Sequence, residues 1–369
     1  MKDKLKVLHL FNSLMPSGAE TMWTAAAPFL KEMGVETHVA ATLPDLGPYA
    51  GRMEEAGFRV HHIPHKAKGH FDWGYFWRLY RFVRKGRFDA VQIHPESWRF
   101  ADCLIAKAAG VPRLTATIHN VFTHSGWRRR LRGLLLRILQ KSGVRIIACG
   151  ASVKRNEERR FGYSPDLIWN GVDFSRYVPR PLARADLGLQ PDQKVLVSVG
   201  NCSRIKNHGF ILDVMRHLPA AWVWVHAGRE EPGRPERNEA VRRGLESRVR
   251  FLGMRGDVPD LLRMADVMAL PSLHEGFSLV GLESMAAGTP AVVAQVPGLV
   301  DIAELFDLCR ACPLEAPAFA RRIEEAAALP ADALQAGRRQ ARELLKSTFD
   351  LCTNVAKYVA LWRGEAAEG

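Results

Sequence analysis

The sequence predicts an α/β protein made of two doubly wound parallel-sheet domains. Its 369 residues exceed what one hydrophobic core usually holds and suit two domains of roughly 150 to 200 residues. Short apolar and β-branched runs alternate with longer helical patterns, which is typical of a parallel sheet covered by helices on both faces. This alternation stops and restarts near the middle of the chain, so each half has enough strands for its own sheet.

The expected elements follow in chain order. In the first half the expected strands cover residues 5–11, 35–41, 58–63, 88–94, 113–119 and 144–149, with a helix over 18–33. In the second half the expected strands cover residues 194–200, 222–228, 248–253, 265–272 and 290–294. Glycine and proline mark the stretch between the two series as a linker. We therefore expect an N-terminal domain over 1–172, a linker over 173–190, a C-terminal domain over 191–348, and a helix over 349–369 that packs back towards the first domain.

The composition is that of a globular protein, with 47% hydrophobic and 25% charged residues. No apolar run approaches the roughly 18 residues of a membrane-spanning helix, and the start of the chain lacks a signal peptide's apolar segment, so we expect a cytoplasmic protein. The six cysteines are scattered, and the pair Cys309 and Cys312 has no second pair or close histidine to complete a metal shell. We expect buried or incidental thiols and no disulfide scaffold.

The net charge of +13 predicts attraction to an anionic partner: nucleic acid, an anionic membrane surface or a phosphate-bearing substrate. Charge alone does not choose among these. The chain has none of the zinc-finger, helix-turn-helix or RRM signatures, so nucleic acid is not an expected partner.

Two glutamates, Glu275 and Glu283, lie eight positions apart in the run HEGFSLVGLE. The preceding strand ends at Pro271, Gly276 permits a sharp turn, and Ser278 is a good N-cap for a helix. A helix start suits a diphosphate because its N–H groups are unpaired, and carboxylates accept hydrogen bonds from sugar hydroxyls. A diphosphate flanked by two sugars describes a nucleotide-sugar, so the pattern is compatible with a nucleotide-sugar site. The alternative is a turn followed by a buried helix whose Glu283 pairs with a basic group.

The run PSLHEGFSLVGLESMAAGTPAVV closely resembles the E-x7-E region of family 4 glycosyltransferases with the GT-B fold. Other stretches fall in the family's order. Residues 17–20 are similar to the glycine-rich turn of its amino-terminal lobe, 169–173 to its interdomain segment, 198–212 to its diphosphate-binding segment, and 249–272 to its base-binding strand and loop. The resemblance covers nearly the whole chain, is stronger in the second half, and implies two Rossmann-like lobes facing each other across a cleft.

The resemblance implies a role for each matching residue. Glu283 would bind the ribose hydroxyls, Glu275 the donor hexose, and Lys206 would neutralise the diphosphate. A fixed cation there would stabilise the negative charge that develops on the leaving nucleoside diphosphate. The backbone N–H groups expected near the sugar and phosphates are those of Gly276, Phe277, Ser278 and Leu279. Without this context, Lys206 would be taken for a solvated loop lysine.

One position departs from the family's pattern. The family usually has an arginine directly after the glycine of this strand, whereas Asn201 follows Gly200 here. Arg204, three residues further on, is a candidate for the second cation, although its side chain starts from a different place. Arg255, within the base-binding segment, is a further donor-binding candidate.

The first half contributes two candidates. His119 directly follows a strand, and the resemblance implies that it contacts the transferred sugar and the acceptor side. Its alternative role is a histidine that caps a strand. Gly18 precedes the first helix, whose amino end would approach the donor diphosphate; the alternative is a simple turn glycine.

The resemblance implies a retaining glycosyltransferase that moves a hexose-type unit from a nucleoside diphosphate donor to a hydroxyl group. A UDP-sugar is the expected donor, and the acceptor is a glycan, a lipid-linked or a small molecule. No tightly bound cofactor and no metal are expected, since no DxD-type acidic pair follows a strand. Two alternatives stay open: a nucleotide-sugar epimerase or hydrolase, and a non-catalytic sugar-nucleotide-binding subunit.

A basic amphipathic pattern covers residues 127–141. Its apolar stripe consists of Trp127, Leu131, Leu134, Leu135 and Ile138, while Arg128, Arg129, Arg132 and Lys141 lie largely outside the stripe. Residues 65–88 also interleave aromatic and basic side chains. Residues 65–88 resemble either a nucleic-acid stacking platform or a rim that docks a lipid-linked or phosphorylated acceptor, and their place in the acceptor-side lobe favours the rim. From the two patterns together we hypothesise peripheral contact with an anionic membrane, at the inner face of the plasma membrane. The alternative for the helix is a stripe that faces the core beneath a solvated basic face.

Overall fold

The computed structural model of the chain describes residues 4–66, 72–177, 182 and 184–365. Parts of the expected linker 173–190, of the basic segment 65–88 and of the C-terminal helix 349–369 lie outside the described residues. The chain divides into two compact units. The first consists of Met1–Gly171 together with Leu351–Gly369, and the second consists of Val172–Asp350.

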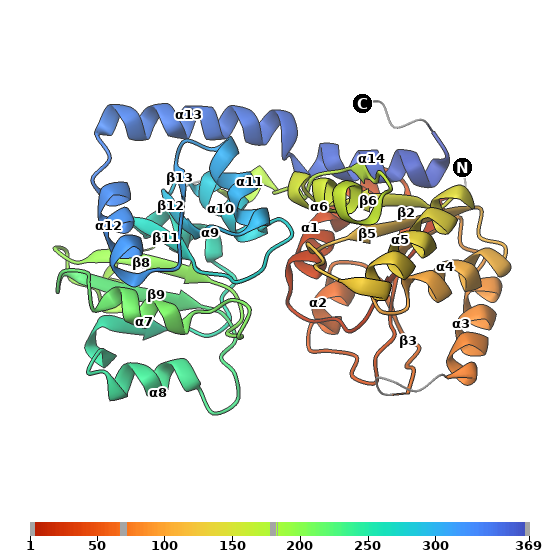
Figure 1. Cartoon of the computed structure of the whole chain (residues 1–369), viewed down its shortest axis with the longest axis horizontal. Helices are drawn as coiled ribbons and strands as arrows, with labels where there is room; N and C mark the ends of the chain where they lie inside the picture. The colour runs from red at the N-terminus through yellow and green to blue at the C-terminus, as the bar shows by residue number, and fades with distance from the viewer. Residues whose placement is uncertain (1–3, 67–71, 178–181, 183, 366–369) are drawn as a thin grey trace. The chain divides into compact units, whose positions relative to one another are not determined.

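The first unit is built on a seven-stranded sheet with the order β3-β2-β1-β4-β5-β6-β7, in which every pair of neighbours is parallel (Figure 1). Its strands are β1 (Leu5–Phe11), β2 (Val35–Ala41), β3 (Arg59–His62), β4 (Ala90–Ile93), β5 (Arg113–Ile118), β6 (Arg145–Ala148) and β7 (Asp166–Leu167). Its helices are α1 (Gly18–Glu32), α2 (Ala50–Glu55), α3 (Trp73–Gly86), α4 (Arg99–Ala108), α5 (Gly126–Lys141), α6 (Ala151–Asn156), η1 (Glu157–Phe161) and α14 (Leu351–Arg363).

The last helix, α14, packs in the first unit although it follows the second unit in the chain. Trp362 and Tyr358 of α14 meet the buried Trp23 of α1 at ring-centroid distances of 5.7 and 5.1 Å. The Trp362 Nε1–H also donates to Thr115 Oγ1 of β5 at 3.1 Å. Through these contacts α14 covers part of one face of the sheet.

The second unit is built on a six-stranded parallel sheet with the order β10-β9-β8-β11-β12-β13. Its strands are β8 (Lys194–Val199), β9 (Trp222–Ala227), β10 (Val249–Phe251), β11 (Val267–Leu270), β12 (Ala291–Ala294) and β13 (Cys309–Cys312). Its helices are η2 (Phe174–Tyr177), η3 (Arg184–Leu187), α7 (Gly209–Met215), α8 (Pro235–Arg242), η4 (Glu246–Arg248), α9 (Val258–Met264), α10 (Leu279–Ala287), α11 (Pro297–Leu305), α12 (Ala316–Ala327) and α13 (Ala331–Thr348).

The predicted strands are all present, most of them one or two residues shorter at an end. The sequence did not predict β7 and β13, which are short strands at the edges of the two sheets. The Cys309–Cys312 pair lies in β13 with both side chains buried, so these thiols contribute to packing. None of the six cysteines, which all lie within the described residues, forms a disulfide, and five are buried. Within the part of the chain that the structure describes, no helix combines the length and the apolar character that crossing a membrane requires.

Both sheets contain a topological switch point, where the chain begins to add strands on the other side of the first one. It lies between β1 and β4 in the first unit and between β8 and β11 in the second. Ligands of open α/β sheets bind outside the carboxyl ends of the strands at such points. Ligand-binding residues are therefore expected at these two edges of the sheets.

Candidate functional site

Two loops lie side by side at the switch point of the second unit. One follows β8 and covers residues 200–208; the other follows β11 and covers residues 271–278. The Leu273 N–H donates to the Ile205 carbonyl at 2.8 Å, and the Asn207 side-chain amide donates to the Pro271 carbonyl at 3.1 Å. These contacts fix the two loops together, because buried or half-buried backbone groups strongly favour paired arrangements.

The same loops bring together Lys206 and Glu275, the two charged residues expected to bind the donor diphosphate and the donor sugar. Lys206 Nζ lies 2.6 Å from Glu275 Oε1, and the Ser272 hydroxyl donates to the same oxygen at 2.9 Å. The side chains of Lys206 and Glu275 keep 30% and 12% of their exposure, so both are accessible from solvent. An anionic ligand that arrives here finds a cation already held in place.

The predicted helix after Glu275 is α10, and it begins as expected. The Ser278 hydroxyl accepts the Gly281 N–H at 3.3 Å, which is an N-cap, and Gly288 ends the helix with a φ of 72°. Phe277 turns inward and stacks on Phe349 at a centroid distance of 5.7 Å. Because the Phe277 side chain is buried, the backbone from Gly276 to Leu279 is held in a fixed position at the positive end of the helix dipole.

A glycine of the next helix supports this loop, and sequence reasoning missed it. A Cβ on Gly298, at the start of α11, would lie 2.4 Å from the Gly276 carbonyl oxygen and 2.6 Å from that of Glu275. Any larger residue would push the loop away. The only local signal is the Pro-Gly pair that opens α11.

Glu283 lies on α10 and interacts with η2, at the start of the segment expected to be the linker. The Tyr177 hydroxyl hydrogen-bonds the Glu283 carboxylate, and the positive charge of Arg176 acts on it. Burial raises the pKa of Glu283 to about 7, and Arg176 and Tyr177 limit that rise. Glu283 is thus half-buried with Arg176 and Tyr177 beside it, which agrees with the alternative that this glutamate pairs with a basic group in a buried helix. Its raised pKa is also typical of binding sites.

The three other donor-side candidates are placed differently. Asn201 Oδ1 accepts the Arg229 N–H at 3.2 Å, so the residue at the family's arginine position helps to join two loops. Arg204 is exposed on the same loop as Lys206. Arg255 pairs with Asp257, with its Nε 2.8 Å from the Asp257 Oδ1. None of these contacts supplies a second cation to the Lys206–Glu275 pair.

The switch point of the first unit carries a row of histidines. His9 lies in β1, His94 follows β4 and His119 follows β5. The His9 Nδ1 to His94 Nε2 distance is 3.2 Å, and the His94 Nδ1 to His119 Nε2 distance is 3.0 Å. The rings of each pair are stacked. Sequence reasoning found His119 and missed the other two, although each of them also lies at the carboxyl end of a strand.

These three imidazoles are neutral. Burial lowers the pKa of His9 and of His119 to about 3, and burial also lowers that of His94. A neutral imidazole has one N–H, so the hydrogen-bonded row has two tautomeric states. In one state His119 presents a free N–H donor at Nδ1, and in the other it presents an acceptor.

Gly18 is the first residue of α1, in the first unit, and is exposed. Beside it the Ser17 hydroxyl donates to the Glu20 carboxylate. Burial raises the pKa of Glu20 to about 7, while its hydrogen bonds counteract the rise. Gly18 and His119 belong to the first unit, and the other candidates belong to the second.

The basic amphipathic helix is α5, and its predicted apolar stripe faces outward. Trp127, Leu131, Leu134 and Ile138 are exposed, at 69%, 43%, 50% and 42%. The buried residues of α5 are instead Gly133, Leu136 and Leu139. The alternative of a core-facing stripe is therefore wrong.

The reason lies in what α5 packs against. A Cβ on Gly133 would lie 2.5 Å from the Phe161 carbonyl oxygen, so only the glycine side of the helix can approach η1 this closely. The expectation that Arg132 lies on a solvated face is also wrong. Its side chain is 10% exposed, and its guanidinium lies 3.0 Å from the Glu157 carboxylate, pairs with Glu96 and stacks on Phe122 and Phe161.

The comparisons with known proteins agree with this architecture. The family model described as Glycosyltransferase Family 4 matches residues 16–176, and the one described as Glycosyl transferases group 1 matches residues 179–343. EpsF of Bacillus subtilis (strain 168), which is assigned as a glycosyltransferase, is 29% identical over 307 residues, covering 78% of this chain and 79% of that protein.

Two further proteins are similar. The UDP-Gal:alpha-D-GlcNAc-diphosphoundecaprenol alpha-1,3-galactosyltransferase of Escherichia coli is 27% identical over 237 residues, covering 60% of this chain and 61% of that protein. The crystal structure of Anabaena Alr3699/HepE in complex with UDP and glucose superposes with a TM-score of 0.80 at 20% identity, covering 98% of this chain and 100% of that chain. The fold is therefore GT-B.

Proposed function

Because the chain belongs to the family 4 glycosyltransferases, we propose that it transfers a sugar from a UDP-sugar donor to an acceptor hydroxyl with retention of anomeric configuration. The observation that carries this proposal is the Lys206–Glu275 pair beside the start of α10, at the switch point of the second sheet. A similar protein, Anabaena Alr3699/HepE, was crystallised with UDP and glucose, which supports a uridine nucleotide as the donor.

The pair suggests how donor binding begins. Lys206 is satisfied by Glu275 in the free chain, at an Nζ–Oε1 distance of 2.6 Å. A donor diphosphate is a stronger partner for the lysine, because it carries more negative charge and several acceptor oxygens. Lys206 then turns to the diphosphate, and Glu275 is released to accept hydrogen bonds from the hexose hydroxyls. The ion pair thus keeps both groups in place until the donor arrives.

The chemical step is the departure of UDP. As the glycosidic bond lengthens, negative charge develops on the diphosphate, and Lys206 together with the N–H groups at the start of α10 stabilises that charge. We assign no divalent metal to this step, since Lys206 would supply a fixed cation and the start of α10 the positive end of a helix dipole. In this proposal the leaving phosphate takes the acceptor's proton on the same face of the sugar, so the anomeric configuration is retained.

His119 and the histidine row are the proposed acceptor side. A neutral imidazole donates or accepts one hydrogen bond without competing for the donor's phosphates, so it suits a sugar or acceptor hydroxyl. His94 and His9 set which role His119 takes, because the proton positions along the row are linked.

A direct test combines nucleotide binding with turnover. In a thermal-shift screen of nucleoside diphosphates and their sugars, we expect UDP and a UDP-sugar to raise the melting temperature most, because a ligand of the folded state stabilises it. UDP release should then require an acceptor. Free sugar or an altered nucleotide-sugar formed without acceptor would indicate a hydrolase or epimerase instead, and donor binding with no turnover by any acceptor would indicate a binding subunit.

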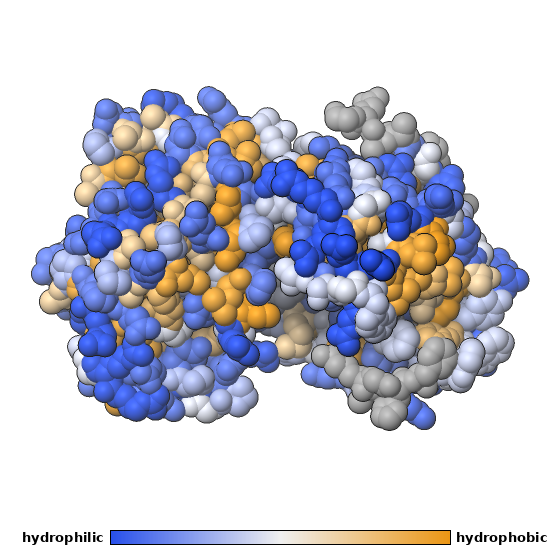
Figure 2. Space-filling model, viewed as in Figure 1, coloured by the Kyte–Doolittle hydropathy of each residue, from blue (hydrophilic) through white to orange (hydrophobic). Residues whose placement is uncertain are grey.

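We further propose that an anionic membrane surface docks on the exposed faces of α4 and α5. Figure 2 shows apolar side chains gathered over these helices, with hydrophilic ones around them. The exposed apolar residues on these two helices are Leu104, Trp127, Leu131, Leu134 and Ile138. The exposed basic residues of α5 are Arg128, Arg129, Arg130, Arg137 and Lys141. Apolar insertion combined with positive charge is the requirement for binding an anionic interface.

A lipid-linked acceptor would explain why the acceptor domain carries such a surface. The similar Escherichia coli protein acts, by its name, on a diphosphoundecaprenol-linked sugar. Leu134→Glu should abolish co-sedimentation with vesicles containing anionic lipid, whereas Val241→Glu, an equally exposed apolar site on α8, should leave it unchanged. Absence of wild-type binding to anionic vesicles at low salt would contradict the proposal.

A further inference from the structure

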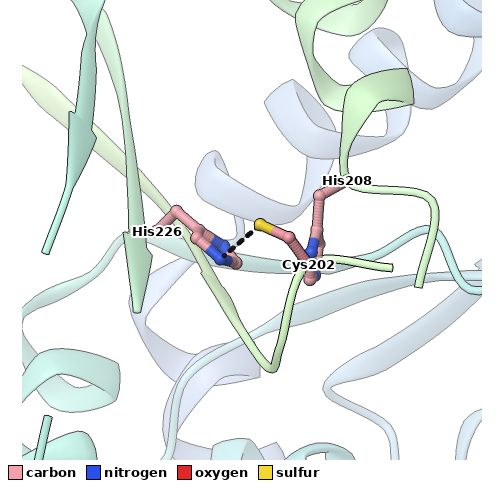
Figure 3. A group of neighbouring side chains, drawn as sticks. All are labelled: Cys202, His208 and His226. Atoms are coloured by element: carbon pink, nitrogen blue, oxygen red, sulfur yellow. Dashed lines mark hydrogen bonds between the residues drawn. The ribbon is translucent and has the colours of Figure 1, made fainter. Parts of the chain in front are cut away.

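Three buried side chains, two of them from the loop that carries Lys206, form a cluster that the proposed transfer reaction does not use. Cys202 and His208 come from the loop after β8, and His226 comes from β9 (Figure 3). Their exposures are 4%, 1% and 0%, and one potential ligand atom from each lies within 4.8 Å of the other two. The closest pair is Cys202 Sγ and His226 Nε2, at 3.4 Å.

The cluster contains polar atoms that the protein itself leaves without partners. Among the residues that the structure describes, His208 Nδ1 has no hydrogen-bond partner, and neither has the buried Oε2 of Glu236. The Glu236 carboxylate also interacts with the Cys202 thiol. Buried polar groups without partners are rare because each one loses its hydration. A bound cation would satisfy these two unpartnered atoms beside the Cys202 thiol.

The imidazoles are ready to act as ligands. Burial lowers the pKa of His226 to about 4 and lowers that of His208 well below its usual value, so both rings are neutral at physiological pH. A hydrogen bond at its other ring nitrogen also orients His226. The Nδ1 of His226 lies 2.8 Å from Ser198 Oγ, and Ser198 Oγ accepts the Trp224 Nε1–H at 2.9 Å. Hydrogen bonding of the second ring nitrogen is how proteins orient metal-binding histidines.

The thiol is protonated in the free chain. Burial and the neighbouring carboxylates, Glu236 above all, raise the pKa of Cys202 to about 12. A divalent ion would displace that proton, and the resulting thiolate together with the Glu236 carboxylate would balance the charge of the ion. Binding must therefore release about one proton per ion and weaken at low pH.

We propose that Cys202, His208 and His226 bind a zinc-class divalent ion, with the Glu236 carboxylate as the fourth ligand. One thiolate, two imidazoles and a carboxylate match the preferences of Zn²⁺ and Co²⁺, whereas Mg²⁺ and Ca²⁺ prefer oxygen ligands. Around a tetrahedral zinc ion, sulfur and nitrogen ligands lie about 3.6 Å apart. The observed 3.4 Å for one pair and the 4.8 Å limit for all three require a contraction of only about 1 Å.

The ion would act on structure and not on the transferred sugar. Its ligands come from both ends of the loop 202–208, from β9 and from the first turn of α8. Binding would fasten this loop, and with it Lys206, to the neighbouring strand and helix. The site is thus separate in chemistry from the Lys206–Glu275 pair, and it can be tested without any nucleotide.

The first experiment measures metal binding by the untagged full-length chain after treatment with a chelator. Addition of Co²⁺ should produce thiolate-to-cobalt charge-transfer absorption that saturates at one ion per chain and is removed by Zn²⁺. At a metal concentration about a hundredfold above Kd, Zn²⁺ should raise the melting temperature by roughly 5 to 10 °C, while Mg²⁺ should not. A wild-type chain without the cobalt–thiolate absorption would overturn the proposal.

The second experiment identifies the thiolate. Cys202→Ala should lose the charge-transfer absorption, while Cys312→Ala, an equally buried thiol on β13 of the same unit, should keep it. Glu236→Gln leaves the three other ligands in place and should weaken Co²⁺ binding about tenfold or more. If the absorption persists in Cys202→Ala, or disappears only in Cys312→Ala, another site binds the metal and the assignment is wrong.

Discussion

The carboxyl-end edges of the two sheets share a topology and differ in chemistry. Each unit places its loops at a switch point of a parallel sheet. The edge of the second unit carries a lysine–glutamate pair, a second carboxylate and a helix start, whereas the edge of the first carries three stacked neutral histidines. One fold therefore offers fixed charge in one unit and uncharged hydrogen bonding in the other.

In the proposed function, this difference corresponds to the two halves of a transfer reaction. A nucleoside diphosphate needs a cation and unpaired N–H groups, since its charge increases in the transition state. An acceptor hydroxyl is neutral and needs only orientation and a hydrogen bond. If the assignment is right, substitutions in the second unit should change donor binding and chemistry, and those in the first should change acceptor use.

The largest effect is expected at Lys206. Lys206→Ala should lower kcat by about 10²- to 10³-fold, because a charge-stabilising group acts mainly in the transition state. Donor affinity should fall much less. Steady-state kinetics with a UDP-sugar would show this split, and Lys346→Ala, an exposed lysine on α13, provides the control. Weaker donor binding with an unchanged kcat would show that Lys206 contributes to ground-state binding only.

Glu283→Ala should mainly weaken nucleotide binding. Hydrogen bonds to an ionised group contribute roughly 1.5 to 3 kcal/mol, which corresponds to about a 10- to 100-fold higher Kd for UDP. Calorimetric titration with UDP measures this directly. Glu343→Ala, an exposed glutamate on α13, should leave the Kd unchanged. An unaltered Kd in Glu283→Ala would support the alternative of a purely structural carboxylate.

The raised pKa of Glu283 predicts a pH dependence of UDP binding. At a pKa of about 7 the carboxyl is mostly protonated at pH 6 and mostly ionised at pH 8, so UDP should bind up to about tenfold more tightly at the higher pH. Glu283→Gln should remove the dependence. In the free chain the folded state holds a proton that the unfolded state has lost between about pH 4.5 and 7, so this carboxyl lowers the free energy of unfolding as pH rises through that window.

The smallest effect is expected from His94, which acts on the substrate only through His119. His94→Ala should lower kcat several-fold and raise the acceptor KM, with UDP affinity unchanged, because the proton position on His119 is no longer fixed. His124→Ala, an exposed histidine of the first unit, is the matched control. A change in UDP affinity would instead contradict the assignment of donor binding to the second unit and acceptor binding to the first.

The sequence predicted much of the fold and part of the site. The strands and α10 with its Ser278 cap were found because periodicity and capping are properties of near neighbours. The edge strand β13 was missed because it covers only four positions, and its two buried residues, Cys309 and Cys312, lie at its ends and do not alternate with exposed ones. From the sequence, the apolar stripe of α5 could face either a membrane or the protein core. The close approach of Gly133 to Phe161 turns another side of the helix inward and leaves the stripe exposed.

By itself, the sequence determined the two-sheet architecture, the family and the loop positions of the charged residues. Only the tertiary structure paired Lys206 with Glu275, aligned His9, His94 and His119, and gathered Cys202, His208 and His226. The physical reason is separation along the chain. Lys206 and Glu275 are 69 positions apart, so the contact leaves no local trace in the sequence; it exists because β8 and β11 are neighbours in the sheet.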